Sequence, residues 1–69
     1  MKTFNYFNQS VTVPDYAKFV ATDADGEVWW YIDKPIISDG WWCTRLAQVN
    51  GRAGNNPNVK NWRRSLREC

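Results

Sequence analysis

Histidine is missing from the 69 residues of this sequence. It is the commonest general base near neutral pH and the commonest metal ligand, so its absence removes the usual routes to acid–base catalysis and to a metal centre. The chain is also too short for one domain to hold both a cofactor cradle and a substrate pocket. We therefore expect a single domain spanning residues 1–69, with no catalytic residue, no cofactor and no metal.

Cysteine and long apolar runs are scarce as well. The two cysteines, Cys43 and Cys69, form no C-x-x-C pair and are too few for a zinc site. A disulfide between them would stabilise the fold by roughly 2–4 kcal/mol. However, residues 1–5 lack the apolar stretch of a signal peptide, so we expect two free thiols in a reducing compartment. No apolar run approaches the roughly 18 residues that a membrane span needs.

Charge is unevenly distributed, although the net charge is only +2. Residues 1–40 carry three lysines against six carboxylates, a net charge of −3. Residues 41–69 carry six cations against one glutamate, a net charge of +5. Such a division arises when one face binds a charged partner, or when two halves of a domain attract each other. In so short a chain, attraction between the halves is the favoured interpretation.

The strongest local pattern is Asp25-Gly26 between two apolar runs. Such a pair is typical of a two-residue type I′ turn, because both central residues need positive φ. This register pairs residue 19 with residue 32, and residue 21 with residue 30. One face of the hairpin is then a predicted core, formed by Phe19, Ala21, Val28, Trp30 and Ile32. The opposite face is formed by Val20, Thr22, Trp29 and Tyr31. A four-residue loop over residues 23–26 is the alternative.

The rest of the sequence predicts one more strand, one loop and one helix. Residues 41–49 are typical of a third strand, and the turn-rich segment 50–58 of a loop. Residues 61–68 are typical of a short helix that begins at Asn61 and docks through Trp62 and Leu66. We therefore predict a small α+β or mainly β domain: a three-stranded antiparallel sheet over 17–23, 27–33 and 41–49, with one short C-terminal helix. In an alternative, the alternating apolar residues between 4 and 13 add a fourth strand at the edge.

Several short motifs, in order along residues 13–68, resemble a group of small accessory proteins of tailed bacteriophages. The motifs are Asp25-Gly26-Glu27-Val28-Trp29, Lys34-Pro35, Gly40-Trp41-Trp42 and Asn61-Trp62-Arg63-Arg64-Ser65-Leu66. The resemblance implies a protein made in the cytoplasm of an infected bacterial host. It implies no enzymatic activity and no catalytic residue.

Aromatic residues make up 16% of the chain, five of them tryptophans, although the mean hydropathy is −0.63. In a strand, each Trp-Trp pair sends one ring inward and one outward. Outward Trp, Tyr and Arg are enriched at protein–protein hot spots, and one short helix is too small to cover them all. The predicted partner-binding residues are Trp29, Tyr31, Trp41, Arg45 and Arg52, followed by Arg63 and Arg67.

These patterns favour binding without catalysis. We expect a phage accessory protein that binds and inhibits a bacterial host protein, in host takeover or in countering a defence system. One alternative is a nucleic-acid-binding protein that uses the basic C-terminal half, where arginines contact phosphates while a Trp stacks on a base. Another is a homo-oligomer, joined through outward aromatics or an open sheet edge.

Overall fold

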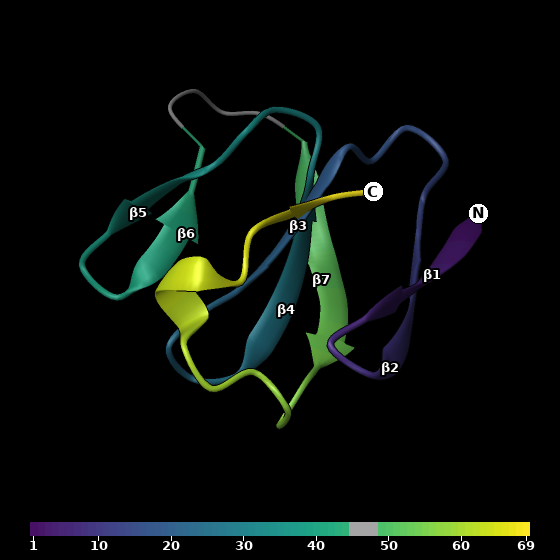
Figure 1. Cartoon of the computed structure of the whole chain (residues 1–69). Coiled ribbons are helices and arrows are strands. Elements are labelled where there is room, and N and C mark those ends of the chain that lie inside the picture. Colours follow the sequence, from purple (N-terminus) through teal and green to yellow (C-terminus); the bar gives the residue numbers. More distant parts are fainter. Residues whose placement is uncertain (45–48) are drawn as a thin grey trace.

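The computed structural model describes residues 1–44 and 49–69. The described chain forms three antiparallel sheets and one short helical turn (Figure 1). The N-terminal sheet is the hairpin β1 (Lys2–Tyr6) and β2 (Gln9–Val13). The central sheet has the order β7-β4-β3-β8, with β3 (Phe19–Thr22), β4 (Glu27–Tyr31), β7 (Asn50–Asn55) and β8 (Arg67–Glu68). The third sheet is the hairpin β5 (Ile36–Ser38) and β6 (Trp41–Cys43), and the turn η1 (Trp62–Arg64) is a 3₁₀ helix. The mainly β, antiparallel class is thus confirmed, whereas the α-helix is not found in the described residues.

The β3–β4 hairpin has a register one residue away from the predicted one. Phe19 pairs with Tyr31 and Thr22 with Val28, and the Asp23 N–H donates to the Glu27 carbonyl at 2.9 Å. The loop therefore has three residues, 24–26, and ends on Gly26 at φ +90°. Because side chains alternate along a strand, this slip of one residue regroups the faces. Phe19 and Ala21 share a face with Trp29 and Tyr31, so both predicted faces, the core face included, are wrong.

Both faces of the central sheet are covered. The N-terminal hairpin packs on one face, where its Tyr6, Val11 and Val13 join Val20 and Val28 in one buried cluster. On the other face, Trp42 of β6 packs with Ala21 and Tyr31, and Trp62 and Leu66 complete this second cluster. Figure 1 shows the two hairpins on opposite sides of β3 and β4. The predicted docking of Trp62 and Leu66 is confirmed, although no α-helix carries it.

The strand beside β4 is the segment that the sequence predicts as a loop. β7 pairs with β4, with a register shift between Val28 and Trp29, so the prediction of a loop over 50–58 is wrong for residues 50–55. Gly51 lies opposite Trp30, and a Cβ built on it would lie 2.7 Å from Trp30 Nε1. The indole ring therefore lies against bare backbone. Residues 41–43 pair instead with β5, and residues 45–48 of the predicted third strand lie outside the described residues.

The C-terminal segment forms a strand after η1 because of Ser65. Its hydroxyl is fully buried, accepts a hydrogen bond from the Thr22 N–H at 2.8 Å and donates to the Trp62 carbonyl at 2.6 Å. The Tyr6 hydroxyl adds bonds to Thr22 Oγ1 at 2.7 Å and to the Ser65 carbonyl at 2.9 Å. Asn61 is the N-cap residue of η1, as predicted, but its side chain makes no capping hydrogen bond. These bonds hold residue 65 against β3, and the chain continues as β8.

Type I′ turns are present, but elsewhere in the chain. Ser38 pairs with Trp41, which leaves Asp39 and Gly40 as a two-residue loop with φ of 48° and 87°. The β1–β2 connection has the same form, with Phe7 and Asn8 at positive φ. The N-terminal segment is thus a separate hairpin and does not form an edge strand of the central sheet. No helix in the described ranges is long and apolar enough to cross a membrane.

Candidate protein-binding surface

Tyr31 lies in the core and not on the surface. It is 3% exposed, and its hydroxyl donates to the Trp42 carbonyl at 3.3 Å. Burial raises the pKa of the Tyr31 hydroxyl, and the nearby Asp23 carboxyl raises it further. The prediction that Tyr31 faces outward is therefore wrong, and its side chain is not available to a partner. The one-residue slip of the hairpin is the physical reason, because it places Tyr31 beneath the third sheet.

Trp29 is half-buried in the same cluster. Within the described part of the chain, its indole N–H is buried without a hydrogen-bond acceptor. It lines a hollow of about 250 Å³, together with Asp23, Tyr31, Trp42, Cys43, Thr44 and Asn50. Most of the Trp29 ring therefore serves packing, so that it contributes little to an outer surface.

The predicted arginines are divided between different parts of the molecule. Arg52 lies on β7 and forms an exposed ion pair with Glu27, with 3.1 Å between Nε and Oε1. β7 and β8 are opposite edges of the central sheet, so Arg52 does not join Arg67 in one site. Arg45 lies outside the described residues. Arg63 lies in η1 and Arg67 begins β8, so both belong to the C-terminal segment.

The β5–β6 hairpin presents an apolar patch, here called the hairpin patch, formed by Ile36 and Trp41, which share one face of the hairpin. Ile37 is also exposed, but it pairs with Trp42 and lies on the other face. The hairpin is anchored through Trp42, whose backbone N–H donates to Asp23 Oδ1 at 2.7 Å and whose Nε1 donates to the Trp62 carbonyl at 3.1 Å. Because Trp42 points inward, its neighbour Trp41 points outward and is 51% exposed. Trp41 is thus on the surface, as predicted.

Asp23 is the buried acceptor that holds this hairpin on the sheet. Its side chain is only 6% exposed, and burial raises the pKa of its carboxyl, while the hydrogen bond from the Trp42 N–H opposes that rise. The position of the hairpin patch therefore depends on a carboxylate inside the protein.

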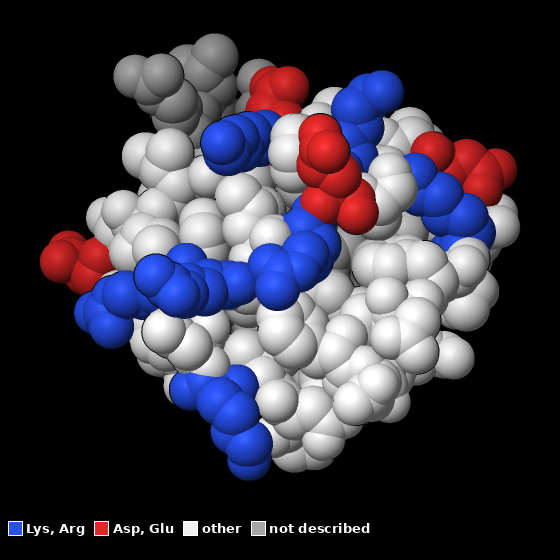
Figure 2. All heavy atoms as spheres, viewed as in Figure 1, with Lys and Arg blue, Asp and Glu red and all other residues white. Residues whose placement is uncertain are grey.

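A row of cations, here called the basic row, follows the C-terminal segment beside this hairpin. It consists of Lys60, Arg63, Arg64 and Arg67, all exposed. Arg63 stacks on the Trp62 ring at 4.6 Å and Arg67 on the Phe7 ring at 4.7 Å. Figure 2 shows basic side chains running across this face, with an acidic side chain adjoining the run at each end. The ion pairs found in residues 1–44 and 49–69 join Met1 to Asp15 and Arg52 to Glu27, so none involves the basic row.

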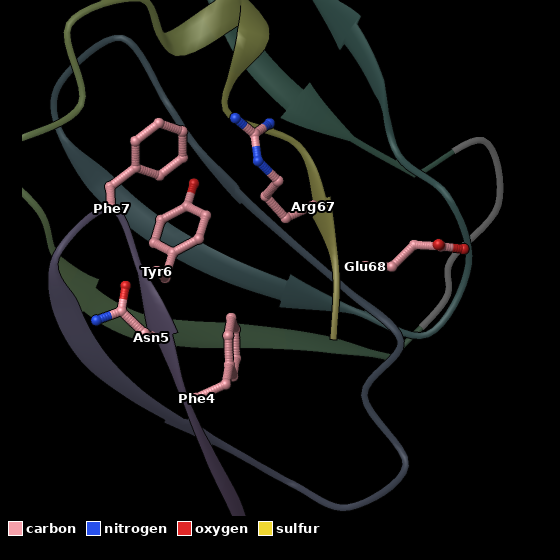
Figure 3. A pocket seen from close by; sticks show the side chains of 6 residues that line it. All are labelled: Phe4, Asn5, Tyr6, Phe7, Arg67 and Glu68. Carbon is pink, nitrogen blue, oxygen red and sulfur yellow. The ribbon is translucent and has the colours of Figure 1, made fainter.

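Two hollows flank β8, at the end of the basic row. The first, here called the aromatic hollow, holds about 320 Å³ between β1 and β8 and is lined by Phe4, Asn5, Tyr6, Phe7, Arg67 and Glu68 (Figure 3). The second, the Leu66 hollow, holds about 380 Å³ and is lined by Phe19, Lys34, Leu66, Arg67 and Glu68. Arg67 and Glu68 line both, which places the two hollows on either side of the same strand.

Neither a metal site nor a cysteine nucleophile is found among the described residues. No group of three His, Cys, Asp or Glu side chains is placed to hold a metal ion within these residues. Cys43 and Cys69 are not joined by a disulfide. Burial raises the pKa of the Cys69 thiol, which favours the unreactive protonated form.

Comparison with protein-family models, curated proteins and solved structures gave no match to this chain. The candidate binding surface is therefore inferred from the geometry of this chain alone. Sequence reasoning missed the aromatic hollow and the exposure of Ile36 and Ile37. The sequence did contain a signal for the exposed isoleucines. Pro35 and the Asp39-Gly40 turn limit their strand to three residues, Ile36–Ser38. No local signal marks the aromatic hollow, because residues 4–7 and 67–68 meet only in the fold.

Proposed function

We propose that this is a non-enzymatic bacteriophage accessory protein that binds and inhibits a bacterial host protein in the host cytoplasm. The observation that supports the proposal is the hairpin patch beside the basic row. A contiguous exposed apolar patch with charged side chains beside it is typical of a protein–protein interface. Trp41 is the natural anchor, because tryptophan is among the residues that contribute most to protein interfaces.

The charge of the surface indicates the kind of partner. The basic row includes three arginines, Arg63, Arg64 and Arg67. Their guanidinium groups form no ion pair with a carboxylate in the part of the chain that the structure describes. Guanidinium groups pair with carboxylates in a bidentate manner, which orients a partner as well as attracting it. A host protein that presents an apolar centre beside Asp or Glu side chains fits this surface.

Capture from bacterial lysate, with and without nuclease, tests the proposal. We expect a protein to be retained by the wild-type chain after nuclease treatment, and to be lost with Trp41→Ser. The matched control is Tyr16→Ser, because Tyr16 is 58% exposed but contacts Trp30 on the opposite face of the sheet. Arg63→Gln should weaken capture, whereas Arg52→Gln, at the far edge, should not. Equal capture by wild type and Trp41→Ser would refute the proposed surface.

Nucleic acid is a second candidate, favoured by Arg63 stacked on Trp62 within the basic row, whose cations form no ion pair within residues 1–44 and 49–69. If all four cations of the basic row contacted a single strand, the logarithm of the binding constant would fall with the logarithm of salt concentration with a slope of about −3. We expect weak binding that nuclease removes. Recovery of nucleic acid alone would replace the protein-binding proposal with this one.

A further inference from the structure

β8 is an open edge of the central sheet. It ends the strand order β7-β4-β3-β8, so it has a neighbour on one side only among the described strands. An open edge presents backbone N–H and C=O groups that can pair with another strand. The opposite edge, β7, is partly occupied, because the Gln9 side-chain amide donates to the Asn55 carbonyl.

The register of β8 shows which backbone groups point outward. The Cys69 N–H donates to the Lys18 carbonyl at 3.0 Å, so residues 69 and 18 form a hydrogen-bonded pair. Hydrogen-bonded and non-hydrogen-bonded pairs alternate along an antiparallel ladder. Glu68, which lies opposite Phe19, is therefore a non-hydrogen-bonded position, and its N–H and C=O point away from β3. These two groups are free to bond an added strand.

The two hollows lie where the side chains of such a strand would go. Arg67 lies opposite Val20, whose face carries the N-terminal hairpin and the aromatic hollow. Glu68 lies opposite Phe19, whose face carries Leu66 and the Leu66 hollow. Successive residues of an added strand would point alternately into the two hollows. Figure 3 shows Phe4 and Tyr6 of β1, and Phe7 of the turn that follows it, on the side of the first hollow opposite β8.

The charges on β8 argue against a second copy of this chain as the added strand. Antiparallel self-pairing through the outward groups of Glu68 must place either Glu68 opposite Glu68 or, shifted by two residues, Arg67 opposite Arg67. Like charges directly opposite each other destabilise a sheet. An acidic residue opposite Arg67 would instead be attracted by its guanidinium group.

We propose that β8 binds an extended segment of a partner protein as a fifth strand of the central sheet, a mode that rests on the proposed binding function. In this mode backbone bonds give affinity, and pockets for alternate side chains give specificity. The segment has an acidic residue opposite Arg67, an aromatic residue two positions earlier over Phe4, and an aliphatic residue between them opposite Glu68. The sequence of the segment is thus aromatic-aliphatic-acidic.

A synthetic peptide tests the mode directly. The probe is fluorescently labelled Thr-Thr-Phe-Val-Glu-Thr-Thr, titrated against the full chain by fluorescence anisotropy. Its control is the same peptide N-methylated at valine, which keeps every side chain but removes the N–H that would bond the Glu68 carbonyl. We expect saturable binding of the first peptide and at least a threefold loss for the second, the effect of one hydrogen bond.

Variants at residue 68 distinguish the contribution of the backbone N–H to peptide binding from that of the side chain. Glu68→Pro removes the outward N–H without removing a bond to β3, because that N–H does not take part in the β3–β8 ladder. We expect this variant to lower the affinity for the peptide about three- to tenfold. Glu68→Thr keeps the N–H and removes a negative charge near the acidic residue of the peptide, so affinity should be unchanged or higher. Amide NMR spectra of both variants would confirm that the sheet is intact.

The outcomes distinguish this mode from the proposed function. Equal affinity of wild type and Glu68→Pro, equal affinity of the two peptides, or no binding at about 1 mM peptide would overturn strand addition. If Trp41→Ser abolishes capture of a host protein while Glu68→Pro leaves it unchanged, the proposed function stands and strand addition fails. If the peptide binds as expected and no protein is captured from lysate, the edge site stands and host binding fails.

Discussion

Gly51→Ala should destabilise the fold because the Trp30 ring occupies the space of the new methyl group. The added Cβ would lie 2.7 Å from Trp30 Nε1 and 2.8 Å from Cε2 and Cζ2, whereas ordinary contacts begin near 3.4 Å. The ring or β7 must therefore move, by 0.7 Å if the contact with Nε1 is to reach an ordinary distance (3.4 − 2.7 Å). The ring is held by an edge-to-face contact with Tyr16, with centroids 5.7 Å apart, and by packing against the buried cluster that includes Val20 and Val28. It cannot swing away at little cost.

The expected magnitude follows from two opposing effects. Overpacking of this kind costs about 1–3 kcal/mol, and replacing glycine by alanine returns about 0.4–1 kcal/mol by restricting the unfolded chain. We expect a net loss of about 1–2 kcal/mol in the free energy of unfolding, measured by urea denaturation. In a domain of this size each kcal/mol lowers Tm by about 4–8 °C. The control Arg52→Ala, on the next residue of β7, loses only an exposed ion pair and should change stability by less than about 1 kcal/mol.

A double-mutant cycle assigns the loss to the Trp30 ring. Trp30→Val keeps a β-branched side chain on the cluster but removes the ring over Gly51. In that background Gly51→Ala should be neutral or slightly stabilising, so the two changes should couple by about 1–3 kcal/mol. If Gly51→Ala were as stable as the wild type, or equally damaging with and without the ring, the close approach of ring and backbone would be wrong.

Three other predictions address the core. Ser65→Ala leaves the buried Thr22 N–H without its acceptor and should cost about 1–3 kcal/mol in urea denaturation, whereas an exposed control, Ser10→Ala, should cost little. Tyr31→Ala should cost about 3–5 kcal/mol and lose near-UV dichroism, as expected for a buried ring; loss of binding with full stability would contradict its burial. The pKa of Asp23 is raised in the folded state, so its contribution to stability is greatest below the unfolded pKa and is lost as pH rises through the folded pKa. Asp23→Asn keeps an acceptor for the Trp42 N–H and should remove this part of the pH dependence; identical pH profiles of the two proteins would refute it.

The strands of the central hairpin could be predicted from the sequence, but their register could not. Asp25-Gly26 fits both a two-residue turn and the observed three-residue loop, because both place glycine at positive φ. The usual arbiter, an alternation of apolar and polar residues, is weak here. Val20 and Ala21 are both apolar neighbours, as are Trp29 and Trp30, and both faces are buried in the fold.

β7 and β8 could not be predicted because their strand character comes from tertiary contacts. The segment Asn50–Asn55 has no β-branched or aromatic residue, and it pairs with β4 because Gly51 admits the Trp30 ring. At the C-terminus, the spacing of Trp62 and Leu66 suits a helix as well as the observed turn and strand. The buried hydroxyl of Ser65 decides between them, and no local pattern indicates that it reaches Thr22.

The same covering of both faces changes where a partner can bind. A sheet whose two faces are packed under hairpins has only its edges and its covering layers left for another protein. Of the edges, β7 is partly capped by Gln9, whereas β8 presents the outward groups of Glu68. Of the covering layers, the β5–β6 hairpin exposes Trp41, the residue of the predicted binding set whose ring remains outside. Both places adjoin the basic row, so an acidic partner can be attracted to either, and the Trp41 and Glu68 variants are the pair that tells them apart.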